Sequence, residues 1–383
     1  MKLTHISLIL VAAALTFTSC KKKGCTNPAS ANYDPSAEKD DGSCEEVTTP
    51  AYTVPTTYSF VDANGNNTVS YSGQTDRLNQ LSEMTTLMGT GTTAAVSAQD
   101  LKDMYANVGD NGNGNFSFTS TKQLKNKTFT LDQTLFESWM DDFATASQSF
   151  GQTASDGQAG TLTSISGSTY LFDANGVEHK QYIEKGLMGA VFLYQALNVY
   201  FGDGKMDVDN TTAEDPTNGK YYTAMEHHWD EAFGYFGVDT DFPTTIPTRF
   251  WGKYCNSQDP TLNCNDDMMT QFLTGRAAIT ANELGDRDAA IAAIRTEWEE
   301  ISANQAMTYL DDCVGYFGSD QAKFLHALSE AYAFAWNLRY APTETRRMTT
   351  TEHDALMQLF PTNFWNVTVS DLNNIKNAIN AKY

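Results

Sequence analysis

GVEHKQYIEKGLMGAVFLYQALNVYF, residues 176–201, is the stretch that predicts the fold. Its apolar residues recur at steps of three and four, which is the spacing of a helix; they are Ile183, Leu187, Ala190, Tyr194, Leu197 and Phe201. The second half is also apolar on its other sides, so we expect a helix in the middle of a bundle. Gly186 and Gly189 would let neighbouring parts of the chain approach closely.

The first half of this stretch carries a polar stripe, because Glu178, Gln181 and Lys185 share one helix face. Glu178 has two interpretations. If Asn175 is the N-cap, Glu178 stands at N3 and completes a capping box. Alternatively, Glu178 and Gln181 bind a ligand together with Glu226 or Glu330 from neighbouring helices. The stripe is the first candidate site.

The rest of the chain after residue 56 is also predicted to be helical. Amphipathic stretches cover residues 131–150, 221–237, 289–315 and 324–340, a Pro-rich loop is expected at 242–267, and strands are nearly absent. The sequence therefore predicts an all-α domain over residues 56–383. Its length indicates two packed sub-bundles rather than one four-helix unit.

Two histidine–glutamate pairs have helical spacing. His227 and Glu231 are four residues apart, as are His326 and Glu330. Together they would form a metal site if their helices meet. Exposed pairs at this spacing are also common without any metal, and they stabilise a helix by only about 0.2–0.5 kcal/mol.

Residues 1–19 are predicted to be a lipoprotein signal peptide. Lys2 precedes a short apolar run, and Phe17-Thr18-Ser19 leads into Cys20. This ending resembles a bacterial lipobox, which implies that Cys20 is lipidated and anchors the protein to a membrane. Three lysines follow, which favours anionic headgroups. We expect a location at the outer membrane, facing the periplasm.

Residues 20–55 are predicted to be a tether. The pattern from Gly24 to Cys44 resembles a small module of exported proteins from Bacteroidetes-type bacteria, which implies an oxidising compartment and a Cys25–Cys44 disulfide. The module contains oxygen ligands of the kind that calcium prefers; they are Asn32, Asp34, Asp40 and Asp41. The alternative is a stapled acidic spacer without metal. A Thr/Pro-rich linker follows up to residue 55.

Composition excludes one class of partner. The net charge is −22, whereas a nucleic-acid-binding protein is expected to carry a basic surface. Among the remaining cysteines, Cys255 and Cys264 are close enough in sequence to predict a short-loop disulfide, and Cys313 is expected to be a buried thiol. The sequence has no HExxH, G-x-S-x-G or Walker motif. We therefore expect a protein that is not an enzyme.

Three stretches resemble a lipoprotein family of Bacteroidetes-type bacteria, domain of unknown function 4856. They are EKGLMGA at Glu184–Ala190, TAMEHHWDEAFGYFG at Thr223–Gly237 and HALSEAYAF at His326–Phe334. The chain is also remotely similar to imelysin-like proteins, which are exported two-bundle all-α proteins linked to iron or haem acquisition. Their Gly-x-His-x-x-Glu motif corresponds to Gly176–Gln181. Glu178 replaces the motif histidine and Gln181 the motif glutamate, so a His/Glu metal site does not carry over.

These observations lead to three hypotheses. The favoured one is a lipid-anchored, non-enzymatic binding protein that helps to acquire iron, haem or another nutrient, with a cleft that uses Glu178, Gln181, Glu226, His227 and Glu330. The second is a structural or protein-interaction lipoprotein of the envelope that has no small ligand. The least favoured is a metal-dependent hydrolase. Convergence of Glu178, Glu226 and Glu330 would support the first, because like charges need a cation or a proton to coexist.

Overall fold

The computed structural model describes residues 22–27, 30, 32, 34–44 and 52–383. The predicted signal peptide and Cys20 lie outside these residues. The chain divides into two compact units between Thr53 and Val54, which falls within the predicted linker.

The first unit contains the predicted disulfide. Cys25 and Cys44 are bonded to each other, which confirms the staple. The short strands β1 (Lys23–Gly24) and β2 (Lys39–Asp40) pair in parallel, with β1 just before Cys25 and β2 within the loop that the disulfide closes. The disulfide thus closes a loop that has few apolar residues of its own.

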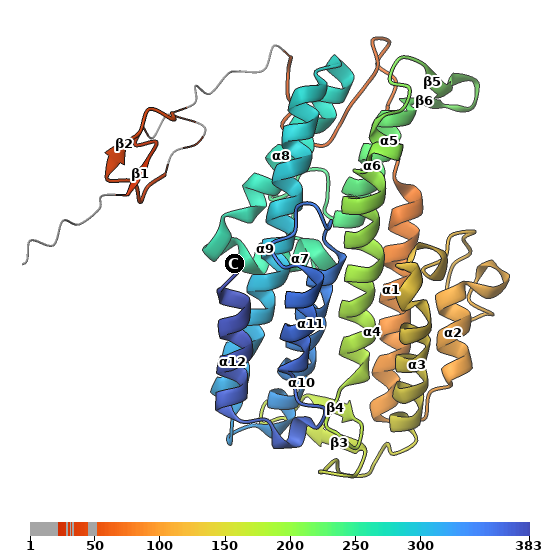
Figure 1. The fold of residues 1–383 in the computed structure, drawn as a ribbon. Helices are drawn as coiled ribbons and strands as arrows, with labels where there is room; N and C mark the ends of the chain where they lie inside the picture. Colours follow the sequence, from red (N-terminus) through yellow and green to blue (C-terminus); the bar gives the residue numbers. More distant parts are fainter. Residues whose placement is uncertain (1–21, 28–29, 31, 33, 45–51) are drawn as a thin grey trace, which may run out of the picture. The chain divides into compact units, whose positions relative to one another are not determined.

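The second unit is mostly helical, as predicted (Figure 1). Its helices are α1 (Ser72–Gly89), α2 (Ala98–Ala106), α3 (Gln133–Ser147), α4 (His179–Leu187), α5 (Asp203–Met206), α6 (Ala224–Phe236), α7 (Phe250–Leu262), α8 (Cys264–Ala281), α9 (Leu284–Tyr316), α10 (Gln321–Asn337), α11 (Thr350–Gln358) and α12 (Val369–Asn380). Two small antiparallel hairpins join them: β3 (Gly160–Thr163) with β4 (Thr169–Phe172), and β5 (Ala213–Asp215) with β6 (Lys220–Thr223). The hairpins were not expected.

The central helix is buried and partly π-helical. After α4 the chain continues through two π-helical stretches, η5 (Met188–Leu193) and η6 (Gln195–Tyr200). Donors from other parts of the fold bond to carbonyls of this helix: Trp251 Nε1 to Met188, Asn337 Nδ2 to Lys185, and the Phe129 amide to Ala190. Insertion of outside donors into the helical ladder is a recognised cause of such irregularity.

Two predictions for residues 242–267 are wrong: the second half of this range is not a loop, and Cys255 and Cys264 do not form a disulfide. Residues 250–262 form α7, and α8 begins at Cys264. Both cysteines are buried free thiols, and the Cys264 thiol donates to the Cys255 carbonyl, 3.1 Å away. The helices orient this thiol towards backbone rather than into a disulfide. Cys313 is a buried thiol, as predicted.

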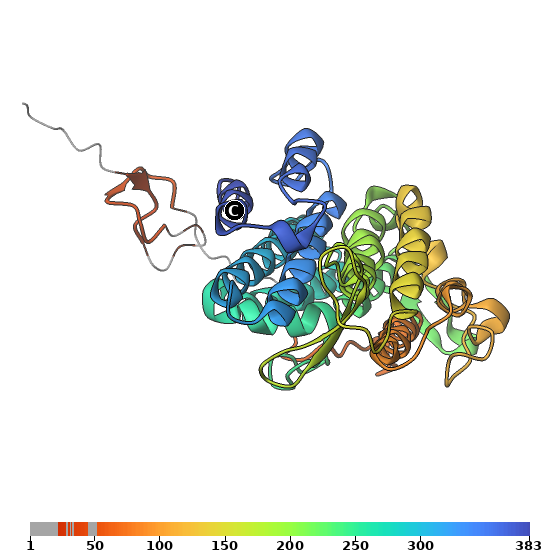
Figure 2. The same cartoon turned by 90° about the horizontal axis from the view of Figure 1, so that it is seen from below.

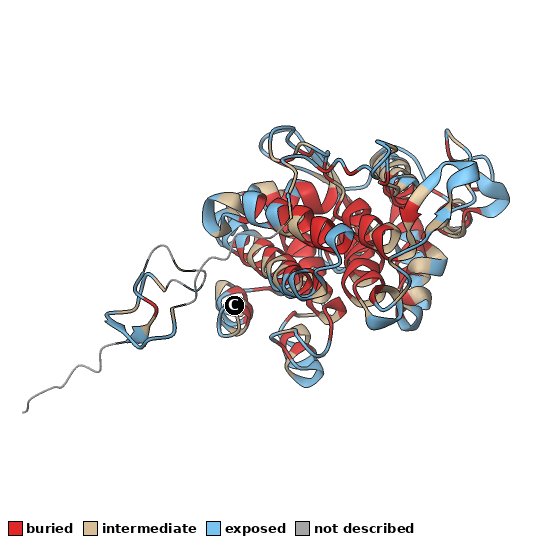
Figure 3. Ribbon diagram, turned by 90° about the horizontal axis from the view of Figure 1, so that it is seen from above, coloured by how far each residue is buried: buried red, intermediate tan, exposed pale blue. Residues whose placement is uncertain are grey.

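Residues 54–383 form one compact unit. The 33-residue helix α9 is the physical reason. At about 1.5 Å per residue it is roughly 50 Å long, and it packs against α7, α8, α10 and α12 along its length. Figure 2 shows the helices of this unit packed side by side when they are seen end-on. Figure 3 shows that the buried residues lie on the helix faces that are turned towards neighbouring helices. No described helix is both long and apolar enough to cross a membrane.

Candidate functional site

Three of the predicted site residues meet where α4 packs against α10. Gln181 Nε2 donates to Glu178 Oε1 over 3.0 Å, and His326 Nδ1 lies 2.5 Å from Glu178 Oε2. The other ring nitrogen of His326, Nε2, lies 3.3 Å from Glu330 Oε2. His326 therefore bridges two buried carboxylates, one on the residue before α4 and one on α10.

Glu178 reaches this position because it precedes the helix. The expected capping box with Asn175 is wrong: α4 begins at His179, and Glu178 has non-helical backbone angles. Its amide donates to Ser329 Oγ on α10 over 2.9 Å. Asp173 orders the preceding turn instead, accepting from the amides of Asn175 and Val177. The side chain of Glu178 is thus free to turn towards α10.

The chain of charges continues towards the middle of the bundle. Lys185 Nζ lies 3.4 Å from Glu330 Oε1 and 3.0 Å from Glu184 Oε1. Burial alone would favour the neutral amine, but the two carboxylates outweigh it and raise the pKa of Lys185. Lys185 therefore forms buried ion pairs with Glu184 and Glu330.

The geometry indicates that His326 is protonated. Both ring nitrogens face carboxylate oxygens, and only the imidazolium can donate from both. Burial opposes the charged form, but Glu178 and then Glu330 raise the pKa of His326 above its ordinary value. Burial by itself would raise the pKa of Glu178. His326 and the Gln181 amide have the larger combined effect and lower this pKa below its ordinary value, so that the carboxyl stays ionised.

These shifts predict a pH dependence of stability. A raised histidine pKa stabilises the fold fully below the ordinary value of 6.5 and loses that contribution as pH rises through the folded-state value. The lowered pKa of Glu178 stabilises the fold above the ordinary value of 4.5, and this contribution is lost as pH falls through the folded-state value. We therefore expect the stability lost in His326→Gln, measured by denaturant unfolding, to be largest between these two values and to shrink in alkali.

His353 provides a control of opposite sign. Burial lowers its pKa to about 4, so its native form is neutral, and its Nε2 donates to the Ala335 carbonyl over 3.1 Å. The stability lost in His353→Gln should therefore decrease as pH falls below 6.5, the reverse of His326→Gln. The same pH trend in both variants would contradict the assignment of charge to His326.

A small pocket of about 130 Å³ opens beside this network. Glu178, Gln181 and His326 line it, together with Lys180 and Tyr170, whose ring stacks on His326 at 4.3 Å between centroids. Gln181 Oε1 is buried and has no hydrogen-bond partner among the described residues. A buried acceptor without a partner costs about 1–3 kcal/mol, so this atom is a natural place for a ligand donor.

Glu226 and His227 do not join the pocket, so the expected convergence of Glu178, Glu226 and Glu330 does not occur. Glu226 completes a capping box with Thr223 at the start of α6 and pairs with Arg276 over 2.7 Å. His227 Nδ1 lies 3.0 Å from the Ser70 carbonyl, and its ring stacks on Tyr222. His227 and Glu231 are not paired; Glu231 bonds to His228.

The four predicted calcium ligands of the first unit have partners of their own. Asp34 pairs with Lys22 over 2.9 Å, and Asn32 donates to the Ser43 carbonyl. Asp40 and Asp41 accept from the amides of the residues two positions on, Gly42 and Ser43. Over the residues that the structure describes, no group of three or more His, Cys, Asp or Glu side chains is placed to hold a metal.

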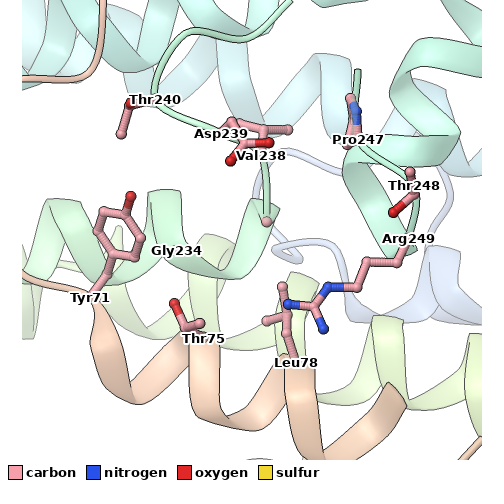
Figure 4. A pocket seen from close by; sticks show the side chains of 11 residues that line it. Tyr71, Thr75, Leu78, Gly234, Val238, Asp239, Thr240, Pro247, Thr248 and Arg249 are labelled. Atoms are coloured by element: carbon pink, nitrogen blue, oxygen red, sulfur yellow. The ribbon is translucent and has the colours of Figure 1, made fainter. Parts of the chain in front are cut away.

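Another cavity, of about 290 Å³, lies between α1 and the segments around Val238 and Pro247 (Figure 4). None of the predicted site residues lines it. Arg249 lies at one end, where its guanidinium donates to Asn79 and Ser82 on α1. These contacts tie the start of α7 to α1.

Sequence reasoning missed two members of the α4–α10 pocket. Tyr170 lies in the unpredicted β3–β4 hairpin, so nothing indicated that it would cover His326. Lys180 follows directly after His179 and carried no distinguishing pattern. His326 itself was noted only for its four-residue spacing to Glu330, and that spacing was the available signal.

A family model described as "Domain of unknown function (DUF4856)" matches residues 55–383. This range agrees with the resemblance inferred from the three helical stretches. No curated protein and no solved structure matches the chain.

Proposed function

The chain belongs to the DUF4856 family, and we propose that it is a lipid-anchored, non-enzymatic binding protein of the cell envelope. In this proposal, a small nutrient molecule that carries an ammonium group occupies the pocket between α4 and α10. The observation that carries the proposal is Gln181 Oε1, a buried acceptor without a partner among the described residues, on a side chain that lines the pocket.

The chemistry of the lining sets the ligand class. Gln181 Oε1 and the Glu178 carboxylate accept hydrogen bonds, which suits an ammonium group. Lys180 also lines the pocket and supplies a positive charge for a carboxylate. Its Nζ lies beside Gly89, another lining residue, 3.8 Å from the position that a Cβ on this glycine would take. A small zwitterion such as an amino acid matches both ends.

The size of the pocket limits the alternatives. About 130 Å³ is below the roughly 300–1,000 Å³ typical of pockets for drug-sized ligands, so a haem does not fit there. Both nitrogens of His326 face carboxylates, which is the geometry of an ion-pair chain rather than of a metal centre. Iron acquisition is therefore proposed only as the process to which the protein contributes. Direct binding of iron in this pocket would contradict the proposal that the ligand is a zwitterion.

The family and compartment extend the proposal. We propose a relation to imelysin-like proteins, supported by Glu178 and Gln181, which occupy the positions of the imelysin motif and line the pocket. We also propose an anchor at Cys20 and an outer-membrane location facing the periplasm, with envelope proteins as further partners. The Cys25–Cys44 disulfide supports an oxidising compartment.

The test is calorimetric binding of glycine, ethanolammonium and Fe²⁺ to the full chain and to Gln181→Leu. We expect saturable binding of glycine that weakens by at least about tenfold in the variant, because a buried acceptor that contacts charge is lost. Ethanolammonium should bind more weakly than glycine, since it lacks the carboxylate that Lys180 would meet.

Gln80→Leu is the matched control. Gln80 is likewise buried, its amide nitrogen donates to the Lys122 carbonyl, and its Oε1 likewise has no partner in the described part of the chain. It does not line the α4–α10 pocket. If no probe binds, or if both variants lose binding equally, the network is a structural device that sets the register of α4 and α10, and the second hypothesis is correct.

A further inference from the structure

A further cavity, separate from the α4–α10 pocket, lies at the N-terminal end of α1. Its volume is about 330 Å³, and it is bounded by the start of α1, the segment around residues 122–127, the end of the central helix and one face of α6. Neither Glu178 nor any other residue of the α4–α10 pocket lines it. We refer to it as the α1–α6 cavity.

The α1–α6 cavity gathers positive charge in a strongly acidic protein. Arg77, Lys122 and Lys127 line it, and Glu231 is the one carboxylate among the lining residues. The whole chain has 47 acidic and 25 basic residues, so unpaired cations are not expected to cluster by chance. Among the described residues, none of the three cations forms a salt bridge. The lining therefore carries three cations against one carboxylate.

Arg77 is the most deeply placed of these cations. It is only 5% exposed, and its guanidinium donates to two backbone carbonyls, of Gln123 and Gly73, rather than to a carboxylate. A buried guanidinium is costly unless a counter-charge is near. Glu231 does not meet that need, because it is engaged by His228 and by Gln74.

Lys127 is likewise a cation that is partly buried without a salt-bridge partner among the described residues. Its Nζ donates to the Tyr200 hydroxyl over 3.1 Å and lies over the ring of that residue. Burial first, and then repulsion from Arg77, lower the pKa of Lys127, although Glu231 opposes both. An anion in the cavity would relieve this repulsion.

The N-terminus of α1 also favours an anion in the cavity. Helix α1 has 18 residues, no side-chain cap and no acidic residue in its first turn. The amides of Ser72 and Gly73 have no acceptor among the described residues. A Cβ on Gly73 would lie 2.9 Å from Lys122 Cε and 3.7 Å from Arg77 Nη1, so both cations lie beside these free amides. Free amides and the helix dipole favour an anion at such a place.

We propose that the α1–α6 cavity is a binding site for a small phosphate-type oxyanion. Arg77, Lys122 and Lys127 supply the charge, and the amides of Ser72 and Gly73 donate to the anion oxygens. His227 lines the same cavity, and since its Nδ1 faces the Ser70 carbonyl, its Nε2 is available as a further donor when the ring is protonated. The predicted binding residue His227 thus has a role, at a different site from Glu178.

The test uses inorganic phosphate and calorimetry on the full chain at low ionic strength. We expect one saturable site, weakened by at least about tenfold in Lys127→Gln and weakened by added salt. Lys253→Gln is the matched control, because it removes the same charge from an exposed lysine that does not line the cavity. Its affinity should stay within about twofold of the unmodified chain.

Ser72→Asp tests the site without removing a cation. The new carboxylate would occupy the N-terminus of α1 beside Lys122, so the melting temperature should rise while phosphate binding is lost. An unchanged phosphate affinity in Ser72→Asp, an equal loss in Lys127→Gln and Lys253→Gln, or no saturable binding at millimolar phosphate would each overturn the proposal. Glycine binding at the α4–α10 pocket should not change in any of these variants, so the two proposals fail separately.

Discussion

Replacing Arg276 by methionine is expected to lower the free energy of unfolding by about 3–5 kcal/mol, the cost of breaking a buried ion pair by removing one partner. Arg276 on α8 is fully buried and holds Asp230 over 3.0 Å and Glu226 over 2.7 Å, both on α6. Methionine fills similar volume but leaves two buried carboxylates without their cation. Chemical denaturation at neutral pH measures the loss.

Arg276 also holds the segment before α1, residues 54–71, onto the bundle. Its Nη2 donates to the carbonyl and hydroxyl of Thr68, and Asp230 accepts from the Tyr58 hydroxyl and the Ser70 amide. We therefore expect residues 54–71 of Arg276→Met to exchange amide hydrogens faster than in the unmodified chain.

Lys376→Met is the control for this prediction. Lys376 pairs with Asp311 at the surface, and exposed pairs contribute only about 0–1 kcal/mol. If Arg276→Met costs no more than Lys376→Met, the buried network contributes little to stability, and α6 and α8 are held together by their apolar contacts.

Gly189→Ala is expected to destabilise the protein by about 3 kcal/mol, although alanine is normally the better helix former by about 1 kcal/mol. A Cβ at this position would lie 2.0 Å from Asn337 Oδ1 and 2.3 Å from its Cγ. Asn337 is fully buried and donates to the Lys185 carbonyl over 2.9 Å, so it has little room to move. The clash would push α10 away from the central helix.

Gly315→Ala is the control, and we expect it to leave stability unchanged or to raise it, the opposite of Gly189→Ala. Gly315 lies near the end of α9, and nothing lies within 4 Å of where its Cβ would be. Its melting temperature should stay the same or rise. A comparable loss in both variants would mean that the close approach of Asn337 is not what Gly189 provides.

Sequence could predict the part of the site that comes from one continuous stretch of the chain. Glu178 and Gln181 were singled out because they share a face of one stretch, and both line the pocket. Glu330 was singled out by its spacing to His326, and the two are paired. Which helix would face them was a matter of packing, and this is why Glu226 was grouped with Glu178 although it pairs with Arg276.

Capping shows the same limit. The Asn175–Glu178 and Thr223–Glu226 pairs have equal spacing, yet only the second forms a capping box. Ser329 and His326 bind Glu178 from another helix and so compete with its local role. A local pattern names the candidates, and long-range partners decide between them.

The sequence by itself determined that this chain is mostly helical, that its centre is the stretch at 176–201, that Cys25 and Cys44 pair and that it belongs to its family, because periodicity, short loops and motifs are encoded by neighbouring residues. Tertiary structure alone decided that residues 54–383 form one unit and that Arg77, Lys122 and Lys127 share a cavity. Those outcomes depend on contacts between segments far apart in the chain, whose partners are chosen by packing and electrostatics after the helices have formed.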